Sequence, residues 1–177
     1  ACGALAALAL YRTLLFIHEL THIHEMALPG FRFVWNLAVG VPMLTPSFMY
    51  EGVHTLHHAR TRYGTVEDPE YLPLALMKPY MLLFFMVVAA FGSIGFLLRF
   101  GVLSPLSLII PWVRRETVAR VSALAINPSY RRAMPEGAFR RDWLIMETAA
   151  SLWSIGIVGS VLMGWISLGA FFTYLGL

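Results

Sequence analysis

The chain has 177 residues, of which 58% are hydrophobic and 13% are charged, and its formal net charge is +3. A soluble domain has about 25% charged residues and at this length still exposes about 30% of its unfolded surface, so this composition excludes a soluble globular protein. The small net charge argues against a nucleic-acid-binding module, the hydrophobicity excludes disorder, and the single cysteine, Cys2, excludes a disulfide scaffold. We therefore expect an all-α integral membrane protein with several transmembrane helices.

Both ends of the chain are apolar. The apolar run begins at Ala1 with no basic segment before it, which differs from a signal peptide. The last residues, 171–177, have no polar cap. We expect a single domain over residues 1–177 that is a fragment of a longer protein, truncated at both ends.

The N-terminal part begins with one expected membrane helix. Residues 1–17 are helix-prone and nearly uncharged, and about 17 residues is the lower limit for crossing a bilayer. Polar residues follow, and we expect the Pro-Gly pair at 29–30 to end that helix. Residues 31–49 are apolar again but contain two prolines four positions apart, which argue against a straight span. We expect a re-entrant or interfacial segment there, which would return the chain to the same side of the membrane.

The rest of the chain contains two longer apolar runs separated by a basic loop. Residues 79–113 are too long for one span, which predicts either a hairpin of one full and one short helix or a span followed by an interfacial segment. Residues 114–141 contain seven of the 13 basic residues, and the positive-inside rule places such a loop in the cytoplasm. In residues 143–177 we expect one helix to end near Met163 and another to begin near Leu168.

All six histidines occur in two clusters, and each cluster lies where an apolar segment meets a polar one. The clusters are His18, His22 and His24, and then His54, His57 and His58. Positions i, i+3 and i+4 share one face of a helix, so five of the six imidazoles can converge, while His24 points elsewhere. Imidazole is a ligand for iron, zinc and copper, and ionisable groups at membrane depth mark functional sites. This arrangement predicts a metal site.

The first cluster also matches a different metal motif. The sequence His18-Glu19-Leu20-Thr21-His22 has the form H-E-x-x-H, in which two histidines bind zinc and the glutamate acts as the general base of a metalloprotease. A membrane zinc protease is therefore an alternative. It leaves the second cluster unexplained, because such a site needs only one further ligand and an open water position, whereas the second cluster has three histidines.

The two boxes together resemble the membrane fatty acid desaturase superfamily, whose relatives include membrane hydroxylases and carotenoid ketolases. H-x-x-x-H at 18–22 is followed by H-x-x-H-H at 54–58, and the surrounding text GVHTLHHARTRYGTVEDPEY and NPSYRR is similar to bacterial members. The resemblance covers essentially the whole chain. The family's third box, another H-x-x-H-H, is absent from these residues, which is the departure that the expected truncation would explain.

The resemblance implies a non-haem centre of two iron ions at the cytoplasmic face of the membrane. The metal ligands that it implies are His18, His22, His54, His57 and His58. Carboxylates usually orient such imidazoles. The candidates are Glu19, Glu25, Glu51, Glu67, Asp68 and Glu70, and among them we expect Glu19, Glu51 and Asp68 to do so.

The activity implied by the resemblance is an O₂-dependent desaturase that inserts a double bond into a long fatty acyl or lipid chain, although this fragment alone is expected to be inactive. A related lipid or carotenoid hydroxylase or ketolase is the alternative. The implied partners are a lipid or fatty acyl substrate, O₂, membrane lipids and a ferredoxin- or cytochrome-type electron donor, and no nucleic acid. We expect the protein in a bacterial inner membrane, with residues 18–30, 50–78 and 114–142 all on the cytoplasmic side.

Overall fold

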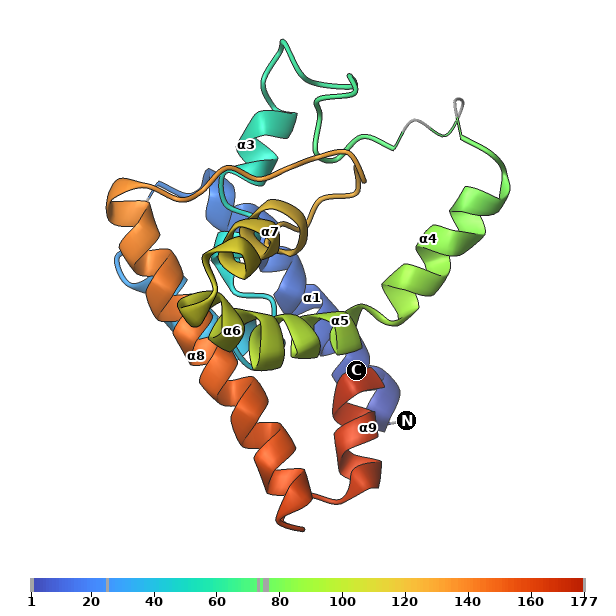
Figure 1. Cartoon of the computed structure of the whole chain (residues 1–177), viewed down its shortest axis with the longest axis vertical. Helices are drawn as coiled ribbons and strands as arrows, with labels where there is room; N and C mark the ends of the chain where they lie inside the picture. Colours follow the sequence, from blue (N-terminus) through green and yellow to red (C-terminus); the bar gives the residue numbers. More distant parts are fainter. Residues whose placement is uncertain (1, 25, 73, 75–76, 177) are drawn as a thin grey trace.

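The computed structural model is entirely helical in its regular elements (Figure 1) within the described residues, which are 2–24, 26–72, 74 and 77–176. Three stretches of this part are long and apolar enough to cross a membrane: α1 (Cys2–His22), the run Gly92–Ile109 and α8 (Gly137–Leu162). The apolar helix α4 (Tyr80–Ala90) is shorter. The prediction of an all-α membrane protein is confirmed.

The first helix ends earlier than the sequence predicts. It stops at His22, and the prediction that it continues to Pro29 is wrong because two side chains favour another path. The Nδ1 of His24 accepts a hydrogen bond from the backbone N–H two residues further on (3.3 Å), and such local pairing competes with a helix. Arg32 donates to the carbonyl of Leu20 (3.1 Å), which satisfies an acceptor that a helix end leaves open.

The segment after α1 is broken into three short helical pieces, which are α2 (Phe31–Trp35), the π-helical turn η1 (Asn36–Gly40) and the 3₁₀ turn η2 (Ser47–Met49). The Asn36 side chain closes this segment, because it donates to Ser47 Oγ and accepts from the Ser47 N–H, both at 2.8 Å. Gly40 is required at its position, since a Cβ there would lie 2.8 Å from atoms of Trp35 and of Asn36. The interruption predicted from the two prolines is confirmed.

The long apolar run in the middle of the chain contains one short and one long helical stretch. After α4 come α5 (Gly92–Leu98), the π-helical turn η4 (Arg99–Leu103), α6 (Ser104–Ile109) and α7 (Pro111–Val121). The chain turns sharply between α4 and α5 (Figure 1), at Phe91. These helix lengths match the first of the two predicted arrangements. The expected basic loop differs from the prediction, because α7 occupies its first part.

The C-terminal part is a long helix followed by a short one. Helix α8 ends at Leu162 and α9 (Leu168–Gly176) follows, so the predicted boundaries near Met163 and Leu168 are confirmed. The buried hydrophobic core lies where α8 meets α7, η4 and the segment before α3 (Val53–His57). Its members are Leu44, Phe48, Met49, Phe100, Val118, Trp143 and Ala150. Phe48 stacks on Trp143 with ring centroids 4.4 Å apart, so the broken segment after α1 is packed directly on α8.

A buried ionic cluster surrounds Arg99, the charged residue inside the middle apolar run. Arg99 is 1% exposed and donates to Glu147 Oε1 at 2.7 Å. Arg114 donates to the other oxygen at 2.5 Å, and the indole N–H of Trp143 donates to it at 3.0 Å. Since an unpaired charge in this environment is costly, the cluster ties η4 and α7 to α8.

The three polar segments of the chain meet at one end of the structure. His22 lies 3.0 Å from His54, measured between their Nε2 atoms. Asn127 donates to the backbone carbonyl of Asp68 at 2.9 Å, which links the basic segment to the loop after the second histidine cluster. The prediction that these segments share one side of the protein agrees with this arrangement.

Candidate metal centre

The two histidine clusters come from one helix end and one short helix. His18 and His22 lie one turn apart at the C-terminal end of α1. His54 and His57 lie on α3, and His58 is its C-cap. Gly52 immediately precedes α3 with φ +74°, a conformation that glycine adopts without strain. The turn before α3 therefore depends on this glycine, and α3 faces the end of α1.

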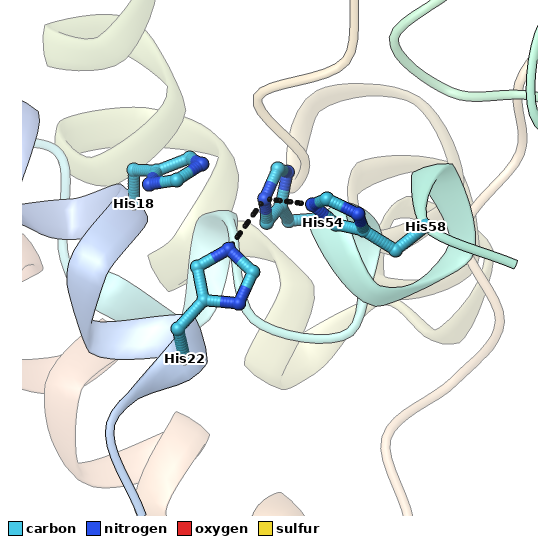
Figure 2. A group of neighbouring side chains, drawn as sticks. All are labelled: His18, His22, His54 and His58. Carbon is cyan, nitrogen blue, oxygen red and sulfur yellow. Dashed lines mark hydrogen bonds between the residues drawn. The ribbon is translucent and has the colours of Figure 1, made fainter.

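Four of the histidine side chains point toward one another (Figure 2): His18, His22, His54 and His58. One ring nitrogen from each lies within 4.8 Å of those of all the others. His54 is buried, and it is central to the group because its Nε2 is 3.0 Å from that of His22 and 2.9 Å from that of His58. Two nitrogens bound to one ion at about 2.1 Å and at a right angle lie about 3.0 Å apart, so these separations suit a shared metal.

The hydrogen bonds around His54 determine which nitrogen faces its neighbours. Its Nδ1 lies 2.7 Å from Oε1 of Glu70, an acceptor, so Nδ1 carries the proton and donates it. The Nε2 lone pair then faces the nitrogens of His22 and His58. Burial lowers the pKa of the His54 imidazole below its ordinary value, against the smaller opposing effect of Glu70. A neutral imidazole with a free lone pair is the form that binds metal.

The same arrangement recurs at two more histidines of the predicted set. His18 Nδ1 is 3.1 Å from Oε1 of Glu19. His57 Nδ1 is 3.0 Å from both carboxylate oxygens of Asp68. A carboxylate that accepts from one ring nitrogen fixes the ring's orientation and increases the basicity of the other nitrogen. This pairing is characteristic of metal-binding histidines.

Tyr50 completes the surroundings of His54. Its hydroxyl lies 2.9 Å from His54 Nδ1, the same nitrogen that contacts Glu70. Burial raises the pKa of Tyr50 above its ordinary value, and Glu70 raises it further. The phenol therefore stays protonated beside the carboxylate that orients His54.

The loop after α3 supplies both Asp68 and Glu70, and it is firmly held. Asp68 is 1% exposed and accepts from the backbone N–H groups of Gly64 and Glu70, each at 2.9 Å. Desolvation raises the pKa of Asp68, but these two hydrogen bonds and that from His57 together lower it below its ordinary value. Asp68 is therefore ionised and is positioned by backbone on both sides.

Two residues of the NPSYRR stretch hold the segments on either side of α3. The Asn127 side chain donates to the carbonyls of Val66 (2.8 Å) and Asp68 (2.9 Å). Arg132 donates to the carbonyl of Glu51 at 2.5 Å, and its guanidinium lies 4.4 Å from the ring centroid of Trp143. Desolvation lowers the pKa of Arg132 to about 10, so it is charged at neutral pH. These two contacts fix the approach to α3 and the loop that leaves it.

Not all of the residues predicted to form the site lie in the group of four histidines. His57 lies beside the group of four, with its ring centroid 5.8 Å from that of His54. His24 is not part of the group, as expected, and Glu51 pairs with Arg32 at 2.9 Å. Of the three acids preferred from the sequence, Glu19 and Asp68 contact histidines. Glu70, which the sequence offered only among the wider set of acids, makes the shortest such contact, and no periodicity could have singled it out because it lies in an irregular loop.

The helices and the histidine cluster define an integral membrane protein with an all-nitrogen candidate metal site at one end of its helices. The chain belongs to the fatty acid desaturase family, whose sequence profile matches residues 1–177. It is also similar to a ceramide hydroxylase from Caulobacter vibrioides (strain NA1000 / CB15N), with 48% identity over 160 residues. That alignment covers 90% of this chain and 45% of the relative, so the chain spans about half the length of the curated relative that it matches. No solved structure matches the chain significantly.

Proposed function

We propose that this chain carries part of a di-iron site of a membrane oxygenase that hydroxylates a lipid. The observation that carries the proposal is the meeting of four imidazoles from α1 and α3, with the Nε2 of His54 within 3.0 Å of two others. Lone pairs placed so closely repel one another unless a proton or a cation lies between them. Neutral nitrogen donors without a thiolate fit iron, and membership of the desaturase family supports this metal.

The residues of this chain have distinct parts in such a site. His18, His22, His54 and His58 would hold iron, and His57, oriented by Asp68, would add a fifth imidazole. When bound, iron supplies the O₂ activation that breaking an unactivated C–H bond requires, which side chains alone cannot provide. Glu19, Asp68 and Glu70 keep the ring protons on Nδ1, so that the metal-facing nitrogens remain free.

Hydroxylation is preferred to desaturation because of the relative at 48% identity, which is a ceramide hydroxylase. In hydroxylation a C–H bond becomes C–OH, the other oxygen atom of O₂ leaves as water, and a donor supplies two electrons with two protons. In desaturation two C–H bonds are broken and both oxygen atoms leave as water with the same donor electrons. We propose a ceramide-like lipid as substrate, a ferredoxin- or cytochrome-type protein as donor, and a cytoplasmic site on a bacterial inner membrane.

The zinc protease alternative receives less support from the geometry. A zinc protease would need only one further ligand from the second cluster, yet both His54 and His58 place a ring nitrogen in the same group as those of His18 and His22. Glu19, the general base that a protease needs, contacts His18 and is 58% exposed in its side chain.

Iron binding tests the site. The purified chain in detergent micelles, freed of metal, is titrated anaerobically with Fe(II) against a chelator of known affinity. We expect His54→Ala to lower iron affinity at least tenfold, and the matched variant His24→Ala, which changes a histidine outside the group, to leave it unchanged. Equal affinity in the two variants would refute the site.

Lipid analysis tests the reaction. The complete reading frame that encodes this chain is expressed in a bacterial host supplied with ceramide, and extracted lipids are compared by mass spectrometry. We expect a product heavier by one oxygen atom that disappears in His54→Ala. A product lighter by two hydrogen atoms would establish desaturation instead, and release of peptide fragments from membrane proteins without any lipid product would establish the protease.

A further inference from the structure

A cavity of about 470 Å³ lies between the end of α1, the segment that follows it and the first turns of α8. Most of its wall is apolar, and its apolar lining includes Leu20, Leu28, Phe31, Phe139, Ile145 and Met146. Ligand pockets typically have about 300–1,000 Å³. The cavity is therefore large enough for a substantial segment of a lipid, and its wall suits a hydrocarbon chain.

One ion pair forms the polar part of this cavity. Arg32 and Glu51 both line it, and their side chains meet at 2.9 Å between Nη1 and Oε2. The other oxygen, Oε1 of Glu51, is buried and has no hydrogen-bond partner among the described residues. A buried carboxylate oxygen without a donor is unfavourable, so a ligand that brings a donor to the Glu51 carboxylate would be stabilised there.

The same ion pair connects the cavity to the histidine segments. A second, more open cavity of about 280 Å³ shares Arg32, Glu51 and Phe139 with the first. Its remaining wall is formed by Thr21, Gly52 and Thr55, which are sequence neighbours of His22 and His54. The pair therefore stands between the apolar cavity and the backbone that carries the candidate ligands.

We propose that the cavity binds the hydrocarbon chain of a neutral amphiphile whose hydroxyl or amide N–H donates to Glu51. The charge of the wall favours a neutral head, since Arg32 is its only cation among the described residues and is opposed by Glu51 and Asp142. A carboxylate or phosphate head would add a further negative charge beside Glu51, and an ionised head has no hydrogen to donate to the Glu51 carboxylate. This inference rests on the proposed function, because it names the substrate class for that site.

Photo-crosslinking locates the bound lipid. The chain in micelles is irradiated with one of two probes of equal chain length that carry a diazirine on the hydrocarbon: an N-acylated long-chain amino alcohol or a fatty acid. We expect the neutral probe to label residues 20–36 and 138–146 at least tenfold more than the fatty acid does. Labelling confined to the outer faces of α4 and α8, or equal labelling by both probes, would overturn the proposal.

Helix α8 offers a matched set of variants. Ala138, Ile145 and Leu152 lie seven residues apart and share one face of the helix, but only the first two line the cavity. We expect Ile145→Trp or Ala138→Trp to reduce cavity labelling at least fivefold and Leu152→Trp to leave it unchanged. Either tryptophan variant suffices, so misfolding of one does not prevent the test, and equal labelling in all three would overturn the proposal.

The charge of Glu51 is tested separately. We expect Glu51→Gln to narrow the preference for the neutral probe about tenfold, since the negative charge that disfavours an anionic head is removed. An unchanged preference would contradict the role of Glu51. Iron affinity is measured in the wild-type chain and in the variant, and it separates the two proposals. A wild-type chain that binds iron normally but labels equally with both probes refutes the cavity alone, whereas a wild-type chain that prefers the neutral probe but does not bind iron refutes the proposed function alone.

Discussion

Replacing Glu70 by glutamine should weaken iron binding without changing the ligands themselves. Glu70 accepts from His54 Nδ1 at 2.7 Å, and the two side chains are 17% and 4% exposed, so solvent screens their interaction little. Removing a partner of this kind lowers metal affinity about 10- to 100-fold, or about 1.4–2.7 kcal/mol. The amide keeps the shape of the carboxylate but loses its charge, so the His54 ring is less basic and less firmly oriented.

The assay is anaerobic Fe(II) titration of the chain in micelles against a chelator, and the same loop offers a matched control. Glu67 lies three residues earlier, its side chain is 68% exposed, and its ion-pair partner Arg62 is 3.9 Å away. Glu67→Gln should therefore leave iron affinity unchanged. If Glu70→Gln and Glu67→Gln bind iron equally well, then the contact with His54 does not orient a metal ligand, and the role assigned to the carboxylates is refuted.

Three further outcomes follow from the same contacts. Glu19→Gln should lower lipid hydroxylation at most several-fold, because Glu19 orients His18 through a contact whose two side chains are 44% and 58% exposed; loss of nearly all hydroxylation would contradict this role, and a protease would instead lose nearly all of its peptide hydrolysis in this variant. Because burial lowers the folded-state pKa of His54 below the unfolded value of about 6.5, the unfolded chain binds this proton more readily. The contribution of His54 to the free energy of unfolding should therefore be complete above about pH 6.5 and should decrease as the pH falls below that value. Fe(II) affinity, measured between about pH 8 and pH 5.5, should decrease over the same range, and an affinity that does not change with pH would contradict this. Glu147→Ala should destabilise the chain by about 3–5 kcal/mol in thermal or denaturant unfolding, since Arg99 would be left buried without its partner.

The helical positions of the histidines could be predicted from the sequence because they follow from local geometry. His18 and His22 share one stripe of α1, and the structure shows both rings facing the second cluster. The boundary between α8 and α9 could also be predicted from the sequence, since it falls at Gly164, which lies between two apolar runs and adopts φ +75°. In each case the signal lies within a few residues of the feature that it predicts.

Contacts between distant segments were beyond the reach of such patterns. Glu70 lies 16 residues from His54, in a loop whose path depends on backbone hydrogen bonds to Asp68 and on Asn127, which is more than 50 residues further along the chain. The end of α1 likewise depends on Arg32, which caps Leu20 from the next segment. Periodicity reports which face of a helix is apolar, but it does not report which irregular segment will cover that face.

The basic segment shows how one composition signal can combine two physical roles. Five of its seven arginines are exposed, namely Arg115, Arg120, Arg131, Arg140 and Arg141, and such residues suit contact with lipid headgroups and the orientation rule that their number suggested. Arg132 differs, because it is 8% exposed and donates to Glu51 immediately before α3. Arg114 pairs with the buried Glu147 of α8. The same segment therefore supplies both a charged surface and the contacts that join α8 to the histidine-bearing end of the fold, so the position of α3 depends on residues whose number alone indicated only membrane topology.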